Sequence, residues 1–342
     1  MNTAAIIAGA IAFLVVALLA PIVTSLCARW RLVDEPGPLR IHSRPIPRLG
    51  GVAITFAISA AAFISIPHLA LHEWPFFAAL GLIWATGLVD DVRGLSPIFR
   101  LAAQIAAGVL IWRSGLHIPV LGTGLLDLVG VCLFVVGFAN AANFFDGADG
   151  LAAGVAGIVA LAYAALPGAA TTPFSHLLAW SLAGACAAFL LFNFPPAKIF
   201  LGDSGSTVLG FCIAFLGLDF YRSASASAPR LVFPILVAGL PVLDAALAIL
   251  RRLLSGSSPL YGDRRHFYDL LLARGWSPRR VALASYGISG ALALIAWVGL
   301  LTVSPQFWSI PALSLMVLLA VALRLGSLRG ETRDSPVRRA RA

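Results

Sequence analysis

The chain has 342 residues, of which 60% are hydrophobic and 11% are charged, and its mean hydropathy is +0.93. These values lie outside the range of an ordinary soluble domain and predict an integral membrane protein surrounded by lipid. The net charge of +9 does not require a nucleic-acid partner, because basic loops orient a membrane protein and attract anionic lipid headgroups.

Apolar runs closed by Arg, Asp, Gly or Pro clusters recur along the whole chain and predict transmembrane helices rather than barrel strands. The first run has no basic segment before it, so we expect it to remain as a span rather than to be cleaved as a signal peptide. We expect eleven spans, at residues 4–26, 50–66, 74–89, 99–113, 124–141, 151–166, 177–194, 204–220, 231–250, 281–302 and 310–325.

The distribution of basic residues predicts how these helices cross the membrane. With the N-terminus outside, 21 Arg and Lys residues fall on the cytoplasmic side and three fall on the opposite side. This is the bias of the positive-inside rule, and it places the C-terminus in the cytoplasm. We therefore expect an all-α polytopic protein, with residues 1–325 as a single membrane domain and residues 326–342 as a basic, disordered tail.

Acidic residues collect at the cytoplasmic ends of the predicted spans. They lie in the stretches "GLVDDVRGLSP", "NAANFFDGADGLAAG", "FNFPPAKIFLGDSGS" and "YGDRRHFYDLLLARG". A single Asp at the end of a span is more often a solvated helix flank, but four such clusters on one face indicate a common site. Carboxylate and amide oxygens from several loops are ligands that Mg²⁺ takes together with substrate phosphates, so the pattern predicts metal-assisted phosphoryl chemistry.

Spacing within these clusters predicts how the side chains point. Asp90 and Asp91 would point about 100° apart on a helix, so at least one has a role other than direct ligation. Asn140 and Asn143 share one helix face, and the two acids of "DGAD" continue their spacing past the helix end. In "GDSGS", Ser204 and the serine two positions later are expected to cap a helix whose N-terminus faces a substrate anion.

Three further residues have two interpretations each. Lys198 is the only lysine, and its place beside an acidic loop suggests contact with a phosphate. Phe200 is expected to stack on a planar base or to anchor the chain at the membrane interface. Asp244 lies within the ninth span, where an ionisable residue indicates either a functional group or a buried structural pair.

In their order along residues 30–290, the motifs "PRLGG", "DD", "NAANFFDGADGL", "PAKIFLGDSGS" and "DRRH" resemble the polyprenyl-phosphate N-acetylhexosamine-1-phosphate transferase family. The resemblance implies transfer of a sugar 1-phosphate from a UDP-N-acetylhexosamine, UDP-GlcNAc or a deoxy relative, to undecaprenyl phosphate, with release of UMP. It implies a requirement for Mg²⁺, with Mn²⁺ as a substitute. It also implies a bacterial inner-membrane enzyme that faces the cytoplasm and starts a cell-surface polysaccharide such as O-antigen, and it leaves a homodimer open.

The resemblance and the residue patterns together assign the candidate site. Catalytic roles fall to Asp90, Asp91, Asp146, Asp149 and His266. The metal is assigned to Asp203 with Asn143. Substrate binding is assigned to Asn193, Lys198, Phe200, Arg264, Arg265, Arg48 and Asn140. We expect a single in-line displacement with Asp90 positioning or deprotonating the acceptor, and a two-step route through an aspartyl phosphate stays open.

Two alternative functions remain from the sequence. The first is a phosphotransferase that uses UDP-N-acetylmuramoyl-pentapeptide, but here His266 is followed by Phe267, Tyr268 and Asp269, where that branch has consecutive histidines. The second is a secondary transporter, which the number of spans and Asp244 would suit. Carriers place their polar site near the bilayer midplane and often contain internal repeats, whereas these acids lie at span ends and no repeat is visible.

Overall fold

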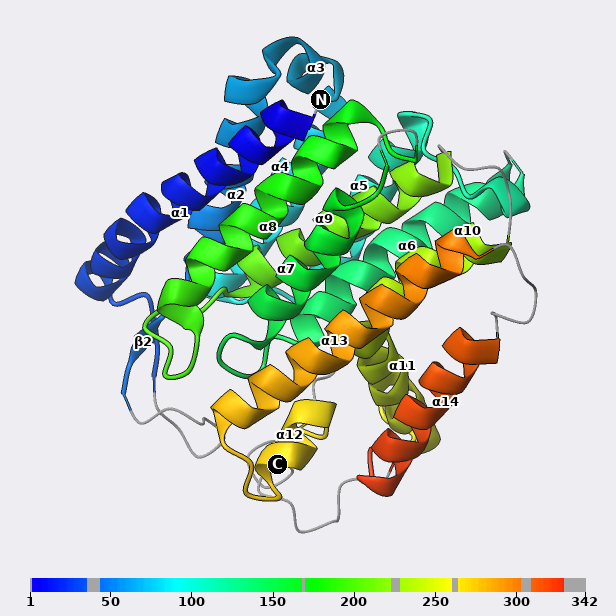
Figure 1. The fold of residues 1–342 in the computed structure, drawn as a ribbon. Coiled ribbons are helices and arrows are strands. Elements are labelled where there is room, and N and C mark those ends of the chain that lie inside the picture. Colours follow the sequence, from blue (N-terminus) through cyan, green and yellow to red (C-terminus); the bar gives the residue numbers. More distant parts are fainter. Residues whose placement is uncertain are drawn as a thin grey trace.

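The structure of the chain, a computed structural model, describes residues 2–35, 44–122, 124–167, 170–222, 228–259, 264–302 and 309–328. These residues form a bundle of helices with one two-stranded sheet (Figure 1). The elements are α1 (Asn2–Trp30), β1 (Val33–Asp34), β2 (Ile46–Pro47), α2 (Gly50–Ser65), α3 (Pro67–His72), α4 (Trp74–Arg93), α5 (Pro97–Arg113), η1 (Pro119–Leu121), α6 (Leu125–Phe144), α7 (Leu151–Ala164), α8 (Pro173–Asn193), α9 (Asp203–Arg222), α10 (Ala228–Val237), α11 (Gly239–Leu254), α12 (Phe267–Leu272), α13 (Pro278–Leu301) and α14 (Ser309–Arg324).

Most of the predicted spans coincide with one helix each, but the ninth, at 231–250, is divided between α10 and α11. Pro241 explains the break, because a proline has no N–H to donate to the carbonyl four residues earlier and its ring clashes with that carbonyl. Among the described residues, six helices are long and apolar enough to cross a membrane, namely α1, α4, α6, α8, α9 and α13. The chain is therefore a membrane protein, and the number of eleven crossings stays a prediction.

Helix α9 lies inside the bundle (Figure 1) and is buried from Ser204 to Tyr221. It packs against α2, α4, α6, α7, α8 and α10. Glycines allow this close packing, because a Cβ on Gly87 of α4 would lie 2.6 Å from Cα of Ser204, and a Cβ on Gly210 would lie 2.3 Å from the carbonyl oxygen of Phe138. Asp203, the first residue of α9, is therefore held by protein rather than by lipid.

The remaining helices surround this core. Helix α1 packs on α8 and α2, α13 packs on α7 and α10, α11 packs on α6, and α14 packs on α13. In Figure 1, α1 lies along one side of the bundle and α14 along the opposite side. Large apolar side chains on α1, such as Leu14 and Leu18, are more than half exposed, as expected for a helix that faces lipid.

The segment between α1 and α2 contains the small sheet, in which Val33 pairs with Pro47 and Asp34 with Ile46 in antiparallel register. The all-α prediction did not include it, because two-residue strands are too short to show an alternating pattern. The "PRLGG" segment continues from this sheet to the link before α9. The N–H of Phe200 donates to the carbonyl of Pro47, and the N–H of Gly50 donates back to the carbonyl of Phe200.

The predicted tail, 326–342, overlaps the described residues at 326–328. Ser327 is 3% exposed, and its carbonyl accepts a hydrogen bond from Arg251, which is itself buried. Ser327 thus provides an acceptor for a buried guanidinium. The rest of the predicted tail, 329–342, lies outside the described residues.

Candidate active site

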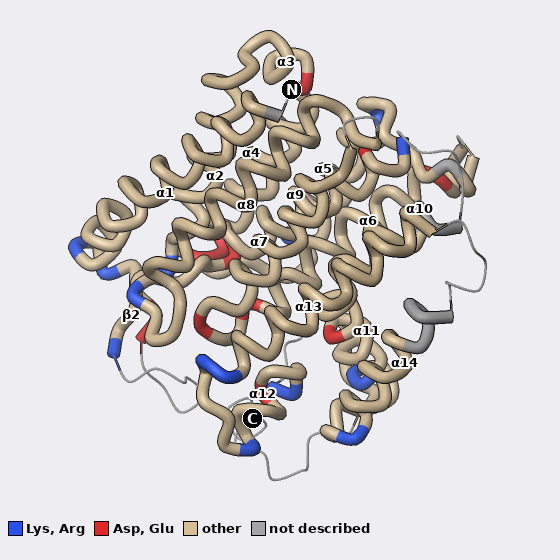
Figure 2. The backbone as a smooth tube through the Cα atoms, in the orientation of Figure 1, with Lys and Arg blue, Asp and Glu red and all other residues tan. Residues whose placement is uncertain are grey.

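A cavity of about 1050 Å³ lies at one end of the bundle, where the loops that the sequence assigned to one membrane face come together. Figure 2 shows basic residues around this end, near β2 and α12, with acidic residues set inside it. Eleven of the predicted site residues line the cavity: Arg48, Asp90, Asp91, Asn143, Asp146, Asp149, Asn193, Phe200, Asp203, Arg264 and His266. The structure therefore gathers residues from distant parts of the chain into one polar site.

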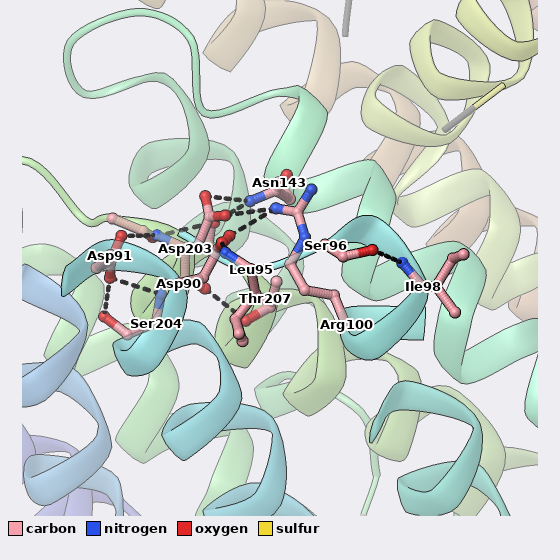
Figure 3. A network of polar contacts seen from close by, with 12 residues as sticks. Asp90, Asp91, Leu95, Ser96, Ile98, Arg100, Asn143, Asp203, Ser204 and Thr207 are labelled. Carbon is pink, nitrogen blue, oxygen red and sulfur yellow. Dashed lines mark hydrogen bonds and ion pairs between the residues drawn. The ribbon is translucent and has the colours of Figure 1, made fainter. Parts of the chain in front are cut away.

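Two of the carboxylates are joined by an arginine that the sequence analysis did not select (Figure 3). Nη1 of Arg100 lies 2.8 Å from Oδ2 of Asp90 and 2.6 Å from Oδ2 of Asp203. Asp90 also accepts a hydrogen bond from the N–H of Leu95. Arg100 was counted only among the cytoplasmic charges. Its place ten residues after Asp90, in the first turn of α5, does not indicate the contact with α9.

Asp91 points in a different direction from Asp90, as the spacing predicted. It is 5% exposed and accepts three hydrogen bonds at the start of α9: from the N–H of Asp203 at 2.8 Å, the N–H of Ser204 at 3.0 Å and the hydroxyl of Ser204 at 2.7 Å. The expectation that this helix N-terminus faces a substrate anion is wrong, because a protein carboxylate already caps it. Asp91 thus anchors Asp203.

Asn143 contacts Asp203 from the side of α6. Its Nδ2 donates to Oδ1 of Asp203 at 2.9 Å (Figure 3). The same nitrogen donates to the hydroxyl of Ser206 at 3.0 Å. The amide nitrogen therefore orients the carboxylate. The pairing of Asn143 with Asp203 in space agrees with their shared assignment, and their metal-binding role stays a prediction.

The loop between α6 and α7 is tied to the link before α9. Asp149 accepts a hydrogen bond from the N–H of Ala197 at 2.9 Å. Asn193, which is 3% exposed, accepts from the N–H of Gly150 at 3.0 Å and donates to the carbonyl of Ile199 at 2.8 Å. Gly150 has a φ of 73°, which favours glycine at this turn. Asp149 and Asn193 thus shape the cavity wall.

Asp146 lies in the same loop and lines the cavity. Burial raises the pKa of its carboxyl well above the usual value, and the negative charges of Asp203, Asp91 and Asp149 raise the pKa further. A carboxyl in such surroundings favours its neutral form until a cation or a positively charged group balances its neighbours. A strongly perturbed acid in a polar cavity is typical of a functional site.

His266 is positioned by Asp244, the acid whose role the sequence left open. Nδ1 of His266 lies 2.6 Å from Oδ2 of Asp244, and the N–H of Phe267 donates to Oδ1 of Asp244 at 2.7 Å. Both side chains are buried. Asp244 on α11 therefore fixes the start of α12 and the ring of His266. Tyr268, which the sequence analysis did not select, stacks on this ring with an interplanar angle of 5° and also lines the cavity.

Three predicted substrate-binding residues do not line the cavity. Lys198 is exposed and lines a smaller pocket. Its two neighbours, Ala197 and Ile199, are buried, and their backbone groups form hydrogen bonds with Asp149 and Asn193. Asn140 donates to Oε1 of Gln104 at 2.6 Å, which directs it toward α5. Arg265 lies next to the lining residue Arg264 but is not part of the wall.

The donor set at the cavity suits a hard divalent cation. Asp90, Asp203 and Asp146 supply carboxylate oxygens, and Asn143 has an amide oxygen. In the part of the chain that the structure describes, no three His, Cys, Asp or Glu side chains converge as a preformed metal site. Mg²⁺ does not need such a cage, since it is commonly held by one or two carboxylates together with water and substrate phosphates. The residues therefore fit Mg²⁺.

Comparison with known proteins agrees with this chemistry. Residues 74–221 match glycosyl transferase family 4. The chain is 32% identical over 305 residues to the "Probable undecaprenyl-phosphate N-acetylglucosaminyl 1-phosphate transferase" of Bacillus subtilis, covering 86% of this chain and 84% of that protein. It is 34% identical to the "Decaprenyl-phosphate N-acetylglucosaminephosphotransferase" of Mycolicibacterium smegmatis, covering 81% of this chain and 75% of that protein.

A second group of relatives bears the name of the alternative transferase. One is the "Phospho-N-acetylmuramoyl-pentapeptide-transferase" of Moorella thermoacetica, which is 33% identical over 291 residues, covering 75% of this chain and 85% of that protein. Both groups of relatives are transferases, and this decides against the transporter that the sequence left as an alternative. With its helical membrane bundle and its acidic cavity, the chain is an enzyme that belongs to glycosyl transferase family 4, within the polyprenyl-phosphate N-acetylhexosamine-1-phosphate transferases.

Proposed function

We propose that this enzyme transfers N-acetylglucosamine 1-phosphate from UDP-GlcNAc to undecaprenyl phosphate and releases UMP. An oxygen of the lipid phosphate attacks the phosphorus that bears the sugar, the bond from this phosphorus to the bridging oxygen breaks, and UMP leaves with that oxygen. The names of the relatives from Bacillus subtilis and Mycolicibacterium smegmatis support the donor sugar and the polyprenyl acceptor.

The observation that carries the proposal is the charge arrangement of the cavity. The same cavity is lined by carboxylates and by guanidinium groups, namely those of Asp90, Asp146, Asp203, Arg48, Arg264 and Arg279. The reaction brings two anionic phosphates together, so its main barrier is electrostatic repulsion. Bound Mg²⁺, with Mn²⁺ as a substitute, would stabilise the developing negative charge as a Lewis acid.

The residues that line the cavity position the acceptor and bind the donor. The second pKa of a phosphate monoester is about 6, so the lipid phosphate is largely dianionic at neutral pH and needs little help from a general base. Asp90 therefore positions the acceptor in an in-line displacement, and a two-step route through an aspartyl phosphate remains the alternative. Arg48 and Arg264 offer guanidinium groups to the diphosphate, and Phe200 offers a ring on which a uracil can stack.

The proposal includes an orientation. The cavity lies at the end where most basic residues gather, and such residues favour the cytoplasmic side. We therefore assign the cavity to the cytoplasmic face of a bacterial inner membrane, where it would meet its nucleotide donor. A homodimer stays a prediction.

The choice of donor rests on the segment after His266. Phe267 is buried in the apolar core, and the hydroxyl of Tyr268 donates to the carbonyl of Phe144 at 3.1 Å. Neither residue can supply the imidazoles of a histidine-rich loop. This favours a simple UDP-N-acetyl sugar over UDP-N-acetylmuramoyl-pentapeptide.

The test is UMP release by the purified protein with undecaprenyl phosphate and Mg²⁺. UDP-GlcNAc, UDP-GalNAc, UDP-QuiNAc, UDP-FucNAc and UDP-N-acetylmuramoyl-pentapeptide are offered in turn, with EDTA and the Asp203→Asn variant as controls. We expect lipid-dependent, EDTA-sensitive release with UDP-GlcNAc. Release with the pentapeptide donor alone would move the enzyme to the other branch, and no release with any donor from folded protein would refute the proposal.

A further inference from the structure

The position of Arg100 is unfavourable for the helix that carries it. Arg100 lies in the first turn of α5, where the positive end of the helix dipole disfavours a basic residue. The neighbouring N-cap, Ser96, accepts a hydrogen bond from the N–H of Ile98, so the end of the helix is stabilised without Arg100. The contacts of its guanidinium, rather than helix stability, account for an arginine there.

These contacts place one nitrogen between two carboxylates that would hold a metal ion. Nη1 of Arg100 is 2.8 Å from Asp90 and 2.6 Å from Asp203, and it bridges oxygens from α4 and α9 (Figure 3). Asp90 and Asp203 would hold Mg²⁺ through carboxylate oxygens, and this nitrogen occupies the space between two of those oxygens. The guanidinium and the ion cannot occupy that space together.

The surroundings show that the carboxylates need a positive charge at this point. The carboxylate of Asp91, from α4, accepts a hydrogen bond from the backbone N–H of Asp203, and Asp146 lines the same cavity. Asn143 approaches Asp203 with a neutral amide. Arg100 is the cation that an ion pair joins to Asp203 among the described residues.

We propose that Arg100 is an internal cation that competes with the divalent metal for Asp90 and Asp203. In the metal-free enzyme its guanidinium balances the two carboxylates, and a metal ion binds there when the guanidinium moves away. This inference rests on the proposed function, since it takes Mg²⁺ as the metal of the site. It implies that the enzyme without substrate binds its metal more weakly than the carboxylates alone would.

The test measures metal affinity without turnover. Binding of Mn²⁺ to the purified protein in detergent is followed by electron paramagnetic resonance of the unbound ion, for the wild type and for Arg100→Ala and Arg100→Gln. We expect about fivefold tighter binding in both variants, the ratio typical of one partly exposed ion pair. Arg113→Ala is the matched control, because it removes the same charge from the other end of α5, where the side chain is exposed.

A second measurement uses thermal unfolding. In EDTA, loss of Arg100 leaves the two carboxylates to repel each other, so its variants should melt at a lower temperature than the wild type. Mg²⁺ should then raise their Tm by more than it raises that of the wild type. The Gln variant keeps the side-chain length nearly unchanged and remains informative if the Ala variant does not fold.

The outcomes separate the inference from the proposed function. Unchanged or weaker Mn²⁺ binding in both variants, with binding in the wild type that Asp203→Asn abolishes, would overturn the role of Arg100 and leave the metal site intact. Binding in the variants alone would support the inference. No binding in any of the proteins, or binding that survives Asp203→Asn, would overturn both.

Discussion

Asp90 and Asp91 are adjacent in the chain but make different contacts. We therefore predict that substitution of Asp91 mainly lowers the stability of the protein, whereas substitution of Asp90 mainly lowers its activity. In Asp91→Asn the side chain keeps its shape but presents one acceptor oxygen instead of two to the start of α9. Its amide group must then face either the N–H of Asp203, or the N–H and hydroxyl of Ser204, all of which donate hydrogen bonds in the wild type. At least one donor loses its partner in a site where Asp91 is 5% exposed.

The size of the effect follows from these contacts. Leaving one buried donor without a partner costs about 1–3 kcal/mol. Loss of the negative charge at a helix N-terminus removes a further 0.3–1 kcal/mol or so. We therefore expect Asp91→Asn to destabilise the protein by about 1–4 kcal/mol. Asp90 is less buried than Asp91 and accepts from one N–H and one guanidinium, so Asp90→Asn should destabilise by about half as much or less.

The assay compares apparent Tm values in detergent with the rate of UMP release. Asp91→Asn should lower Tm by several degrees and also lower activity, because Asp203 loses its anchor. Asp90→Asn should abolish most of the activity with a small change in Tm. A variant of Asp91 that melts at the wild-type temperature, or one of Asp90 that melts lower than the Asp91 variant, would refute this division of roles.

Three further predictions concern other parts of the site. The raised pKa of Asp146 makes folding take up a proton, so the stability of the wild type should fall as the pH rises above about 4. In EDTA, Asp146→Asn should therefore stabilise the protein increasingly with pH, and parallel profiles of Tm against pH for the two proteins would contradict this. Gly87→Ala should destabilise by about 1–3 kcal/mol in thermal unfolding, because its Cβ would overlap the start of α9, whereas Gly81→Ala on the same helix meets nothing within 4 Å and should be neutral or stabilising. Alanine variants of Asp244 and His266 should show a coupling free energy of at least about 1 kcal/mol in a double-mutant cycle of unfolding, and additive effects would rule out their hydrogen bond as a stabilising contact.

The fold shows which features hydropathy predicts well. The predicted span 204–220 became Asp203–Arg222, and 124–141 became Leu125–Phe144, because polar residues mark both ends of each apolar run. The break between α10 and α11 was missed, since it interrupts an apolar run without any polar residue. Prolines are common within transmembrane helices and do not by themselves indicate that a helix is divided.

In the site, residue type predicted which residues gather but not which atoms they contact. Asp91 and Ser204 are far apart in the chain, and only the packing of α4 on α9 brings them together. Arg100 lies on α5, and the packing of α5 on α4 brings it to Asp203, so its role was not visible in the sequence. Lys198 was selected because it is the only lysine, but it is exposed and lines a smaller pocket instead of the cavity.

The burial of α9 has a consequence for biosynthesis. Every residue from Ser204 to Tyr221 is buried against other helices, so α9 has little contact with lipid to favour its insertion. Of the helices that pack on it, α2, α4, α6, α7 and α8 are synthesised earlier and α10 directly afterwards. The ribosome therefore delivers α9 when most of its partners are already in the membrane. Substitutions on the surfaces that receive α9 should lower the yield of assembled protein before any defect in turnover can be measured.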